Sequence, residues 1–455
     1  MSIFATRAWH AGAWHDQVRL CVTDGIITQV HCGTQPQSED ARVDTLLPAL
    51  ANLHSHSFQR AMAGRTEHRR AGQDSFWSWR SLMYQFLDHL TPDQIEAIAG
   101  LVFMEMQEAG YAAVGEFHYV HHQPGGTPYD DSAELSKRIL AAATQTGIGL
   151  THLPVLYTYG GAGKAPLSGG QRRFGTTIDA YLHLLDQIAC TLPDMPADTR
   201  LGVAPHSLRA TAPQDLTVLL ANSASRPVHM HIAEQPKEVE DIQNWLAARP
   251  VEWLLETQSV AKQWCLIHAT HMTEAETLNL AKTGAVVGLC PITEANLGDG
   301  PFNGPHYLRA GGTFGVGSDS NIRISLTEEL RMLEYSQRLR DLKRNLMVPE
   351  TGSVGQTLYL GAAAGGAQAL QRNAGKLEVD CLADLVAINS ADAQLAGLAQ
   401  TQIFDGLCFA ASDRVVTDLW SAGRHMVQSG RHILRDKITQ DYGRVMAQLL
   451  RSLTN

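Results

Sequence analysis

The sequence has few cysteines, and none of them form a close pair. The 455 residues contain seven cysteines, an odd number, and no Cys-x-x-Cys motif. A disulfide framework is therefore not expected, and the thiols should be reduced, as in a cytoplasmic protein. The seven are Cys21, Cys32, Cys190, Cys265, Cys290, Cys381 and Cys408.

Long apolar runs, a basic excess and a targeting pattern are also missing. No apolar run approaches the ~20 residues that a membrane span needs. Residues 1–7 contain no basic region followed by an apolar core, so no signal peptide is evident. The net charge of −10 and the pI of about 6.0 argue against nucleic acid or an anionic membrane as a partner. We therefore predict a cytoplasmic protein, whose pocket could still bind an acidic small molecule through a few arginines.

The pattern of apolar residues divides the chain into three parts. Residues 1–48 contain short alternating stretches, and residues 375–455 return to β character before a final helix. Between them, residues 49–374 alternate apolar strand-like runs with helical segments, as βα units do. We therefore predict a (β/α)₈ TIM-like barrel at 49–374, and a small β-sandwich domain built from both chain ends, 1–48 and 375–455.

The individual elements follow from local periodicity. Barrel strands are expected at residues 45–52, 112–117, 148–156, 201–204, 228–232, 265–268, 285–290 and 313–319. Strands of the small domain are expected at 8–10, 17–22, 26–30, 375–379, 383–388, 415–420 and 424–427. Helices are expected at about 91–109, 130–146, 237–248, 273–283 and 437–453.

Residues that ligate metals follow several of the predicted barrel strands. His54 and His56 are separated by one residue, so their side chains share one face of an extended chain. Barrel enzymes place their chemistry at the carboxyl ends of the strands. Histidines and an aspartate at those ends can hold one catalytic metal ion with a position left for water. The predicted ligands are His54, His56, His231 and Asp319; they suit Zn²⁺, and also Fe²⁺ or Mn²⁺.

The same motifs resemble a known family. His54-Ser55-His56 after an apolar strand, His229-x-His231-x-x-Glu234 and His268 after Cys-Leu-Ile resemble the amidohydrolase superfamily, as does Ser318-Asp319-Ser320-Asn321. The mononuclear deaminase branch is the most similar, because the predicted strands 148–156 and 201–204 lack the lysine that bridges two metals in dinuclear relatives.

Three further segments give a finer resemblance. Residues 58–64, 75–80 and 329–335 are similar to formimidoylglutamate deiminases. Those enzymes hydrolyse N-formimino-L-glutamate to N-formyl-L-glutamate and ammonia in histidine degradation. The resemblance implies the same activity here, with a dicarboxylate substrate.

The resemblance also implies roles for individual residues. His268 and Asp319 would orient a metal-activated water and take its proton, and Glu234 would carry a proton to the departing nitrogen. A dicarboxylate needs cationic partners, and Arg80, after an aromatic run, and Arg209 are the candidates. The implied substrate contacts are Gln59, Arg80, Tyr119, His206 and Arg209.

Two other functions stay open at this point. A deaminase of guanine or another heterocycle would share the metal ligands but would not need two arginines for carboxylates. A non-catalytic metal-binding relative would be expected to lose His268 or Glu234, and this chain keeps both. A homodimer is expected, since dimers are the commonest symmetric state and the resembling family tends toward them.

The sequence leaves several residues without an assigned place. His229 is expected to be a core histidine or a support for the metal ligands. The charge-rich segment 65–70 is expected to be a solvated loop. Whether Arg323 or the cluster of His118, His121 and His122 reaches the pocket does not follow from spacing.

Overall fold

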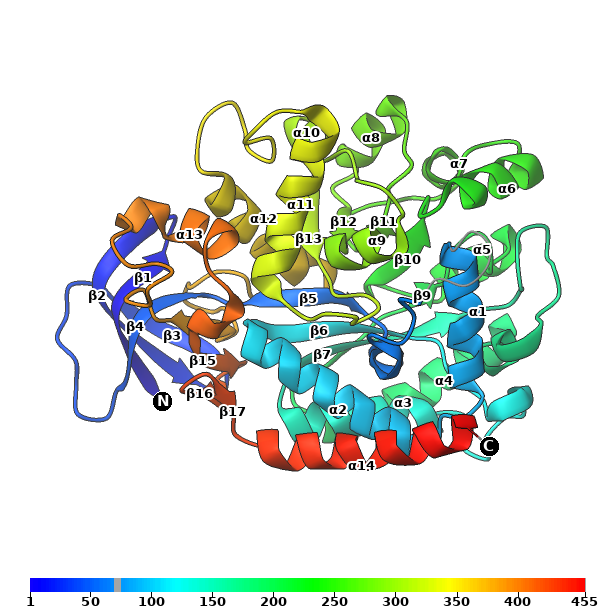
Figure 1. Ribbon diagram of the computed structural model, residues 1–455, viewed down its shortest axis with the longest axis horizontal. Coiled ribbons are helices and arrows are strands. Elements are labelled where there is room, and N and C mark those ends of the chain that lie inside the picture. The colour runs from blue at the N-terminus through cyan, green and yellow to red at the C-terminus, as the bar shows by residue number, and fades with distance from the viewer. Residues whose placement is uncertain (69–74, 455) are drawn as a thin grey trace.

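The structure is a computed structural model that describes residues 1–68 and 75–454. It contains a parallel barrel and a mixed sheet beside it (Figure 1). Residues 65–68 are irregular and mostly exposed, as expected for a solvated loop, whereas residues 69 and 70 of the same segment lie outside the described residues. Within the described chain, no helix combines the length and apolarity needed to cross a bilayer.

The barrel consists of two parallel sheets that meet at both edges. One sheet has the order β5-β6-β7-β8, with β9 also paired to β7, and the other has the order β10-β11-β12-β13. Single bridges, Val203 to Val228 and Ser55 to Asp319, join them into a ring. The strands are β5 (Leu50–Ser55), β6 (Tyr111–His118), β7 (Gly149–Leu156), β8 (Arg200–Leu201), β9 (Ala204–Pro205), β10 (Val228–Ile232), β11 (Trp264–His268), β12 (Val286–Leu289) and β13 (Thr313–Val316).

The predicted eight-stranded barrel is thus confirmed, with two local differences. The expected strand at 201–204 is two short pieces, β8 and β9, because Gly202 and Val203 donate to carbonyls of different neighbours, His152 and Pro227. The expected strand at 45–52 runs from the mixed sheet into the barrel. It divides at Ala49, whose N–H donates to Asp384 of the small sheet.

Helices surround the barrel and begin where the sequence provides caps. At the start of α2 (Pro92–Ala109), Thr91 accepts a hydrogen bond from the Gln94 N–H, and Gly110, with φ +104°, ends the helix. The other barrel helices are α1 (Phe76–Leu87), α3 (Glu134–Thr146), α4 (Ile178–Ala189), α5 (Pro213–Ala221), α6 (Pro236–Leu246), α7 (Pro250–Thr257), α8 (Glu274–Ala281), α9 (Pro291–Leu297), α10 (Gly304–Arg309), α11 (Leu326–Asp341) and α12 (Val354–Ala369). Short 3₁₀ turns cover 57–62, 124–126, 169–173, 192–194, 400–402 and 413–415.

The last barrel strand approaches the first unusually closely. A Cβ on Gly317 would lie 2.7 Å from both the backbone N and O of His54. Beside it, the Asp319 N–H donates to the His54 carbonyl and the His56 N–H donates to the Asp319 carbonyl, each at 2.9 Å. Only glycine fits at 317, and this contact brings the expected metal-ligating segments together.

Strands from both chain ends form one eight-stranded mixed sheet with the order β17-β16-β15-β14-β4-β1-β2-β3. It encloses its own apolar cluster, which includes Ile3, Leu20 and Trp420. This confirms the predicted second β unit, whose limits as a domain stay a prediction. The strands are β1 (Ser2–His10), β2 (Ala13–Thr23), β3 (Ile26–His31), β4 (Ala41–Pro48), β14 (Leu385–Ile388), β15 (Val416–Ser421), β16 (Arg424–Gln428) and β17 (Arg431–His432).

One expected strand of this unit, 375–379, is wrong. Gly375 and Asp380 both have positive φ, +79° and +69°, so the segment turns instead of extending. Leu377 is nevertheless buried in the cluster of the small sheet, which explains the apolar pattern that suggested a strand. Two more helices follow, α13 (Ile403–Phe409) and α14 (Arg435–Thr454). The closing helix α14 lies along α2 (Figure 1).

A buried ionic network fastens the small sheet to the barrel. The Arg372 guanidinium, fully buried, donates to Asp384, just before β14 of the small sheet, at 2.9 Å and to Asp198 near β8 at 3.0 Å. Arg424 on β16 donates to both oxygens of the same Asp198, at 2.7 and 2.8 Å. Two arginines and two aspartates therefore balance one another between the two units.

Replacing Arg372 with methionine is expected to lower the free energy of unfolding by about 3–5 kcal/mol, because two buried carboxylates lose a cationic partner. A urea titration followed by tryptophan fluorescence measures the change. Arg414→Met is the matched control, since Arg414 is largely exposed and pairs with Asp392 only at 3.8 Å. Equal midpoints for the two variants would contradict a stabilising role for the network.

Candidate active site

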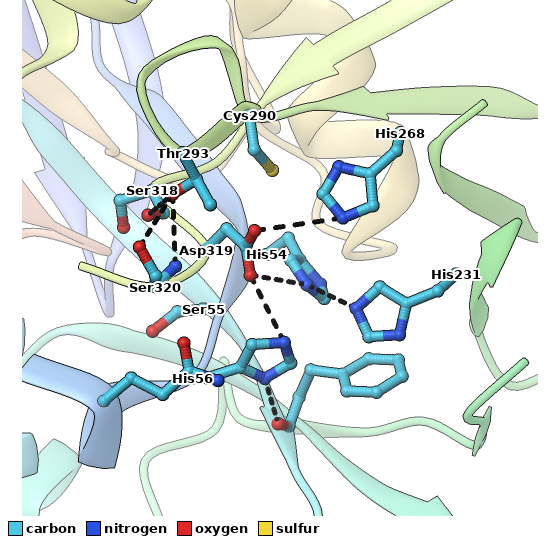
Figure 2. A network of polar contacts seen from close by, with 12 residues as sticks. His54, Ser55, His56, His231, His268, Cys290, Thr293, Ser318, Asp319 and Ser320 are labelled. Atoms are coloured by element: carbon cyan, nitrogen blue, oxygen red, sulfur yellow. Dashed lines mark hydrogen bonds and ion pairs between the residues drawn. The ribbon is translucent and has the colours of Figure 1, made fainter. Parts of the chain in front are cut away.

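Three histidines and one aspartate converge at the carboxyl edge of the barrel, as Figure 2 shows. His54 is the penultimate residue of β5, His56 follows that strand directly, His231 lies on β10 and Asp319 follows β13. One ligand atom from each lies within 4.8 Å of the others, and all four residues are buried. The structure therefore brings together the four residues that the sequence singled out.

Hydrogen bonds orient two of these imidazoles toward the centre. His56 Nδ1 donates to the Phe117 carbonyl at 2.9 Å, and His231 Nδ1 donates to the His206 carbonyl at 3.1 Å. Both Nε2 atoms then carry lone pairs, since burial lowers the pKa of each ring and keeps it neutral. Fixing the far nitrogen in this way is typical of metal-ligating histidines.

The charges at this point fit a bound cation. His56 Nε2 lies 3.3 Å from Asp319 Oδ1, and His54 Nε2 lies 3.5 Å from the same oxygen. His54 Nε2 and His231 Nε2 are 3.0 Å apart. Lone pairs and a carboxylate this close repel one another unless a cation lies between them, and imidazole with carboxylate is a donor set for Zn²⁺, Fe²⁺ or Mn²⁺.

The loop that carries Asp319 is strained and firmly held. Asp319 has φ +47° and Asn321 has φ +54°, a region that costs free energy for residues with a side chain. Thr293 Oγ1 donates to the Ser318 carbonyl at 3.1 Å and the Ser320 N–H donates to Thr293 Oγ1 at 3.3 Å (Figure 2). These buried bonds fix the carboxylate at the centre.

His268 and Glu234 lie beside the four converging residues. His268 Nε2 is 3.8 Å from Asp319 Oδ2 and 4.0 Å from Glu234 Oε1, and its Nδ1 bonds to Glu294 Oε1 at 3.2 Å. Burial opposes a charge on this ring, yet the hydrogen bond to Glu294 and the nearby carboxylates raise the pKa of His268 to about 10. Glu294 was not expected from the sequence, because a glutamate on a helix carries no spacing signal for such a contact.

A pocket opens over these residues. It is partly apolar, and Phe76, Trp79 and Phe174 are part of its wall. The five residues expected to contact substrate all line it: Gln59, Arg80, Tyr119, His206 and Arg209. The lining also includes Tyr157 and Leu297, which the sequence did not indicate.

Both arginines of the pocket are fixed by neighbours. Arg80 donates to the Tyr157 hydroxyl at 2.6 Å and stacks on Trp77 and Tyr84, with its guanidinium carbon 5.7 and 5.5 Å from the ring centres. The aromatic run that precedes Arg80 in the sequence supplies one of these two rings, Trp77.

Arg209 forms an ion pair that the sequence did not reveal. Its Nη2 donates to Glu234 Oε2 at 2.7 Å, and its Nε is 3.6 Å from Glu238 Oε2. Within the described residues Arg209 Nε has no hydrogen-bond partner, so donors remain for a further anion. Burial works against the charge, but the two glutamates raise the pKa of Arg209 above its usual value.

His229, His121, His122 and Arg323, whose places the sequence left open, do not line this pocket. His229 is fully buried, and its Nε2 bonds to the Ala369 carbonyl at 2.8 Å, as expected for a core histidine. His121 and His122 bond to the carbonyls of Val155 and Gly175. Arg323 lies at a separate polar groove together with Arg60 and Arg414, and pairs with Glu328.

Fold and donor set together define the class, a metal-dependent enzyme on a closed parallel barrel. A model described as the amidohydrolase family matches residues 45–426 of the chain. The chain belongs to the amidohydrolase family, and it is a hydrolase of C–N bonds by that membership.

Curated relatives and solved structures agree with this family. A formimidoylglutamate deiminase from Pseudomonas aeruginosa is 47% identical over 99% of this chain and 99% of its own. A 5-methylthioadenosine/S-adenosylhomocysteine deaminase from Natronomonas pharaonis is 28% identical over 77% of this chain and 74% of its own.

Among solved structures, an amidohydrolase from Brucella melitensis superposes with a TM-score of 0.95 at 44% identity, over 99% of both chains. An adenosine deaminase from Xanthomonas campestris with bound zinc superposes at 0.81 and 21% identity, over 100% of this chain and 98% of its own, which shows the shared fold.

Proposed function

We propose that this hydrolase converts N-formimino-L-glutamate and water to N-formyl-L-glutamate and ammonia, a step of histidine degradation. The observation that carries the proposal is a pair of fixed arginines, Arg80 and Arg209, in the same pocket as the metal donors. A linear substrate with an amidine at one end and carboxylates at the other needs both features. The 47%-identical relative with this name supports it.

In this proposal the four converging residues hold one metal ion. Zinc is the proposed ion, held by His54, His56, His231 and Asp319; when bound it would polarise the substrate and lower the pKa of a water molecule. The arrangement of neutral Nε2 lone pairs around one carboxylate supports this assignment.

The proton steps are assigned to residues beside the metal donors. A metal cation held by Asp319 would offset the carboxylates that raise the pKa of His268 to about 10 and would so favour the neutral ring. His268 Nε2 then accepts a proton from the attacking water together with Asp319, and its 3.8 Å separation from Asp319 Oδ2 supports the pairing. Glu234 passes a proton to the nitrogen that leaves as ammonia. Its Oε1 lies 4.0 Å from His268 Nε2, so a proton can move between the two with little displacement.

Substrate binding is assigned to the rest of the pocket. Arg80 and Arg209 bind the carboxylates, and Gln59, Tyr119 and His206 contact the remainder of the substrate. Gln59 donates to the Tyr119 hydroxyl at 2.6 Å, while its Oε1 has no hydrogen-bond partner among the described residues. That buried acceptor suits an N–H group of the substrate.

We further propose a cytoplasmic homodimer. The reduced, scattered cysteines support the location, and the frequency of two-fold assemblies supports the dimer. Sedimentation equilibrium of the purified chain tests the second point, since a mass near one or four chains would contradict it.

Product analysis tests the proposed reaction. Zinc-loaded protein incubated with N-formimino-L-glutamate should release ammonia and N-formyl-L-glutamate in equal amounts, measured by an ammonia assay and by NMR. Formamide plus glutamate would mean that the other C–N bond is cut, and the proton assignments would be wrong. Guanine is the control substrate; faster turnover of guanine would favour the heterocycle deaminase instead.

Replacing Arg209 with methionine is expected to raise KM for N-formimino-L-glutamate about 10- to 100-fold, because a charge-assisted hydrogen bond to a carboxylate is lost. Steady-state kinetics on folded protein measure it, and Arg444→Met on the exposed face of α14 is the control. An unchanged KM would place the carboxylates elsewhere. The variant should also unfold more easily, since Glu238 stays buried without its cation.

A further inference from the structure

A second group of side chains that could ligate a metal shares Asp319 with the first. His268, Cys290 and Asp319 are all buried, and one ligand atom from each lies within 4.8 Å of the others. Figure 2 shows the Cys290 thiol directed toward the space between His268 and Asp319. The proposed reaction makes no use of this thiol. We propose that His268, Cys290 and Asp319 form a second zinc site, which shares Asp319 with the first and inhibits the enzyme when filled.

The two oxygens of Asp319 face different sets of donors. Oδ1 lies 3.5 and 3.3 Å from the Nε2 atoms of His54 and His56, whereas Oδ2 lies 3.8 Å from His268 Nε2. A carboxylate that gives one oxygen to each of two ions holds them about 3.5–4 Å apart. In a tetrahedral zinc site with bonds of about 2.0–2.3 Å, two ligand atoms lie roughly 3.3–3.7 Å apart. The ligand atoms of His268, Cys290 and Asp319 lie within 4.8 Å of one another, so they need only small shifts to bind one ion.

One carboxylate, Glu294, already holds both new ligands in place. Glu294 Oε1 bonds to His268 Nδ1 at 3.2 Å and accepts from the Cys290 backbone N–H at 2.9 Å. His268 Nε2 is thereby turned toward Asp319 and Cys290. A carboxylate on the far nitrogen is the usual support of a metal-ligating histidine.

The surroundings favour a second cation. Glu234 and Glu294 are buried nearby. Among the described residues, the arginine that pairs with Glu234 is Arg209, which also lies against Glu238. Thiolate, imidazole and carboxylate together select zinc over magnesium or calcium. Binding releases the thiol proton of Cys290 to solvent.

A zinc ion in the second site would stop the reaction by occupying the atom that accepts the proton. His268 Nε2 is the atom assigned to accept the proton from water, and a zinc ion bound there removes that lone pair. The inhibition therefore rests on the proposed function, whereas the binding of the second ion does not.

Equilibrium dialysis against zinc chloride tests the site. Wild-type protein carrying one zinc per chain should take up a second ion, and its turnover should fall at least 10-fold as it does so. In Cys290→Ala the uptake should stop at one ion, and the concentration of added zinc that halves the rate of its own one-zinc form should rise at least 10-fold. Cys408→Ala, which removes a buried thiol in α13, should behave as wild type. Saturation of wild type at one ion, or a second ion retained by Cys290→Ala, would overturn the proposal.

Cobalt provides a readout that requires neither a variant nor a substrate. The first equivalent of Co²⁺ should bind without sulfur, and the second should add a thiolate-to-cobalt charge-transfer band in the near ultraviolet. Absence of that band at two equivalents would overturn the second site. The band together with no turnover of N-formimino-L-glutamate would instead reject the proposed function and leave the second site standing.

Discussion

Turnover of N-formimino-L-glutamate is expected to fall about 10³-fold when Glu234 is replaced by glutamine, within the range for loss of a general acid–base group. Glutamine has nearly the same size and can still accept the hydrogen bond from Arg209, but it cannot carry a proton to the leaving nitrogen. Steady-state kinetics on zinc-loaded protein measure kcat, and metal analysis shows whether the ion stays bound.

The control for this experiment is Glu240→Gln. Glu240 is an exposed residue of α6, a few residues after Glu234. Glu240→Gln makes the same chemical change away from the pocket. Glu234→Gln should match it in thermal stability and in zinc per chain, because Arg209 keeps Glu238 as a partner. Wild-type turnover in Glu234→Gln would remove this residue from the proton pathway.

Replacing Asp319 with asparagine is expected to abolish activity by a different route. The variant loses the only carboxylate among the four proposed ligands, so zinc binding should weaken at least about 100-fold. Without the ion, the attacking water returns toward its bulk pKa, and turnover should fall at least about 10³-fold. Metal content after dialysis and kcat are the two measurements.

Asp241→Asn serves as the matched variant, because Asp241 is a partly exposed residue of α6 and forms its described ion pair with Lys237. A chelator applied to wild type should reproduce the loss, and added zinc should reverse it there more readily than in Asp319→Asn. Full zinc occupancy in Asp319→Asn together with wild-type kcat would contradict the proposed ligand set.

The sequence predicted the barrel and its metal donors because both depend on local pattern. Strand ends bear His54, His56, His231 and Asp319, and a parallel barrel gathers strand ends at one edge whatever the loops do. The strand expected at 375–379 shows the limit of such patterns: Leu377 is buried as a strand residue would be, yet the backbone turns around it.

Contacts between distant side chains could not be predicted. Glu294 meets His268 because helix α9 follows β12 closely, and Arg209 meets Glu238 across two separate elements. Neither pair has a fixed spacing in the sequence. The same holds for the Cys290 thiol, which lies near Asp319 because β12 and β13 are paired neighbours in the barrel. Such contacts depend on side-chain packing in three dimensions, which periodicity does not encode.

The small sheet built from both chain ends has a consequence for how the protein is made. On one side β4 pairs with β1, but its other partner, β14, begins at Leu385, more than 300 residues later. During synthesis β4 therefore presents an open edge until almost the whole barrel has left the ribosome, and open edges invite pairing with other chains. Loss of the C-terminal segment would expose the same edge permanently. Premature termination near the end of the gene should thus produce an aggregating protein, even though every proposed catalytic residue is present.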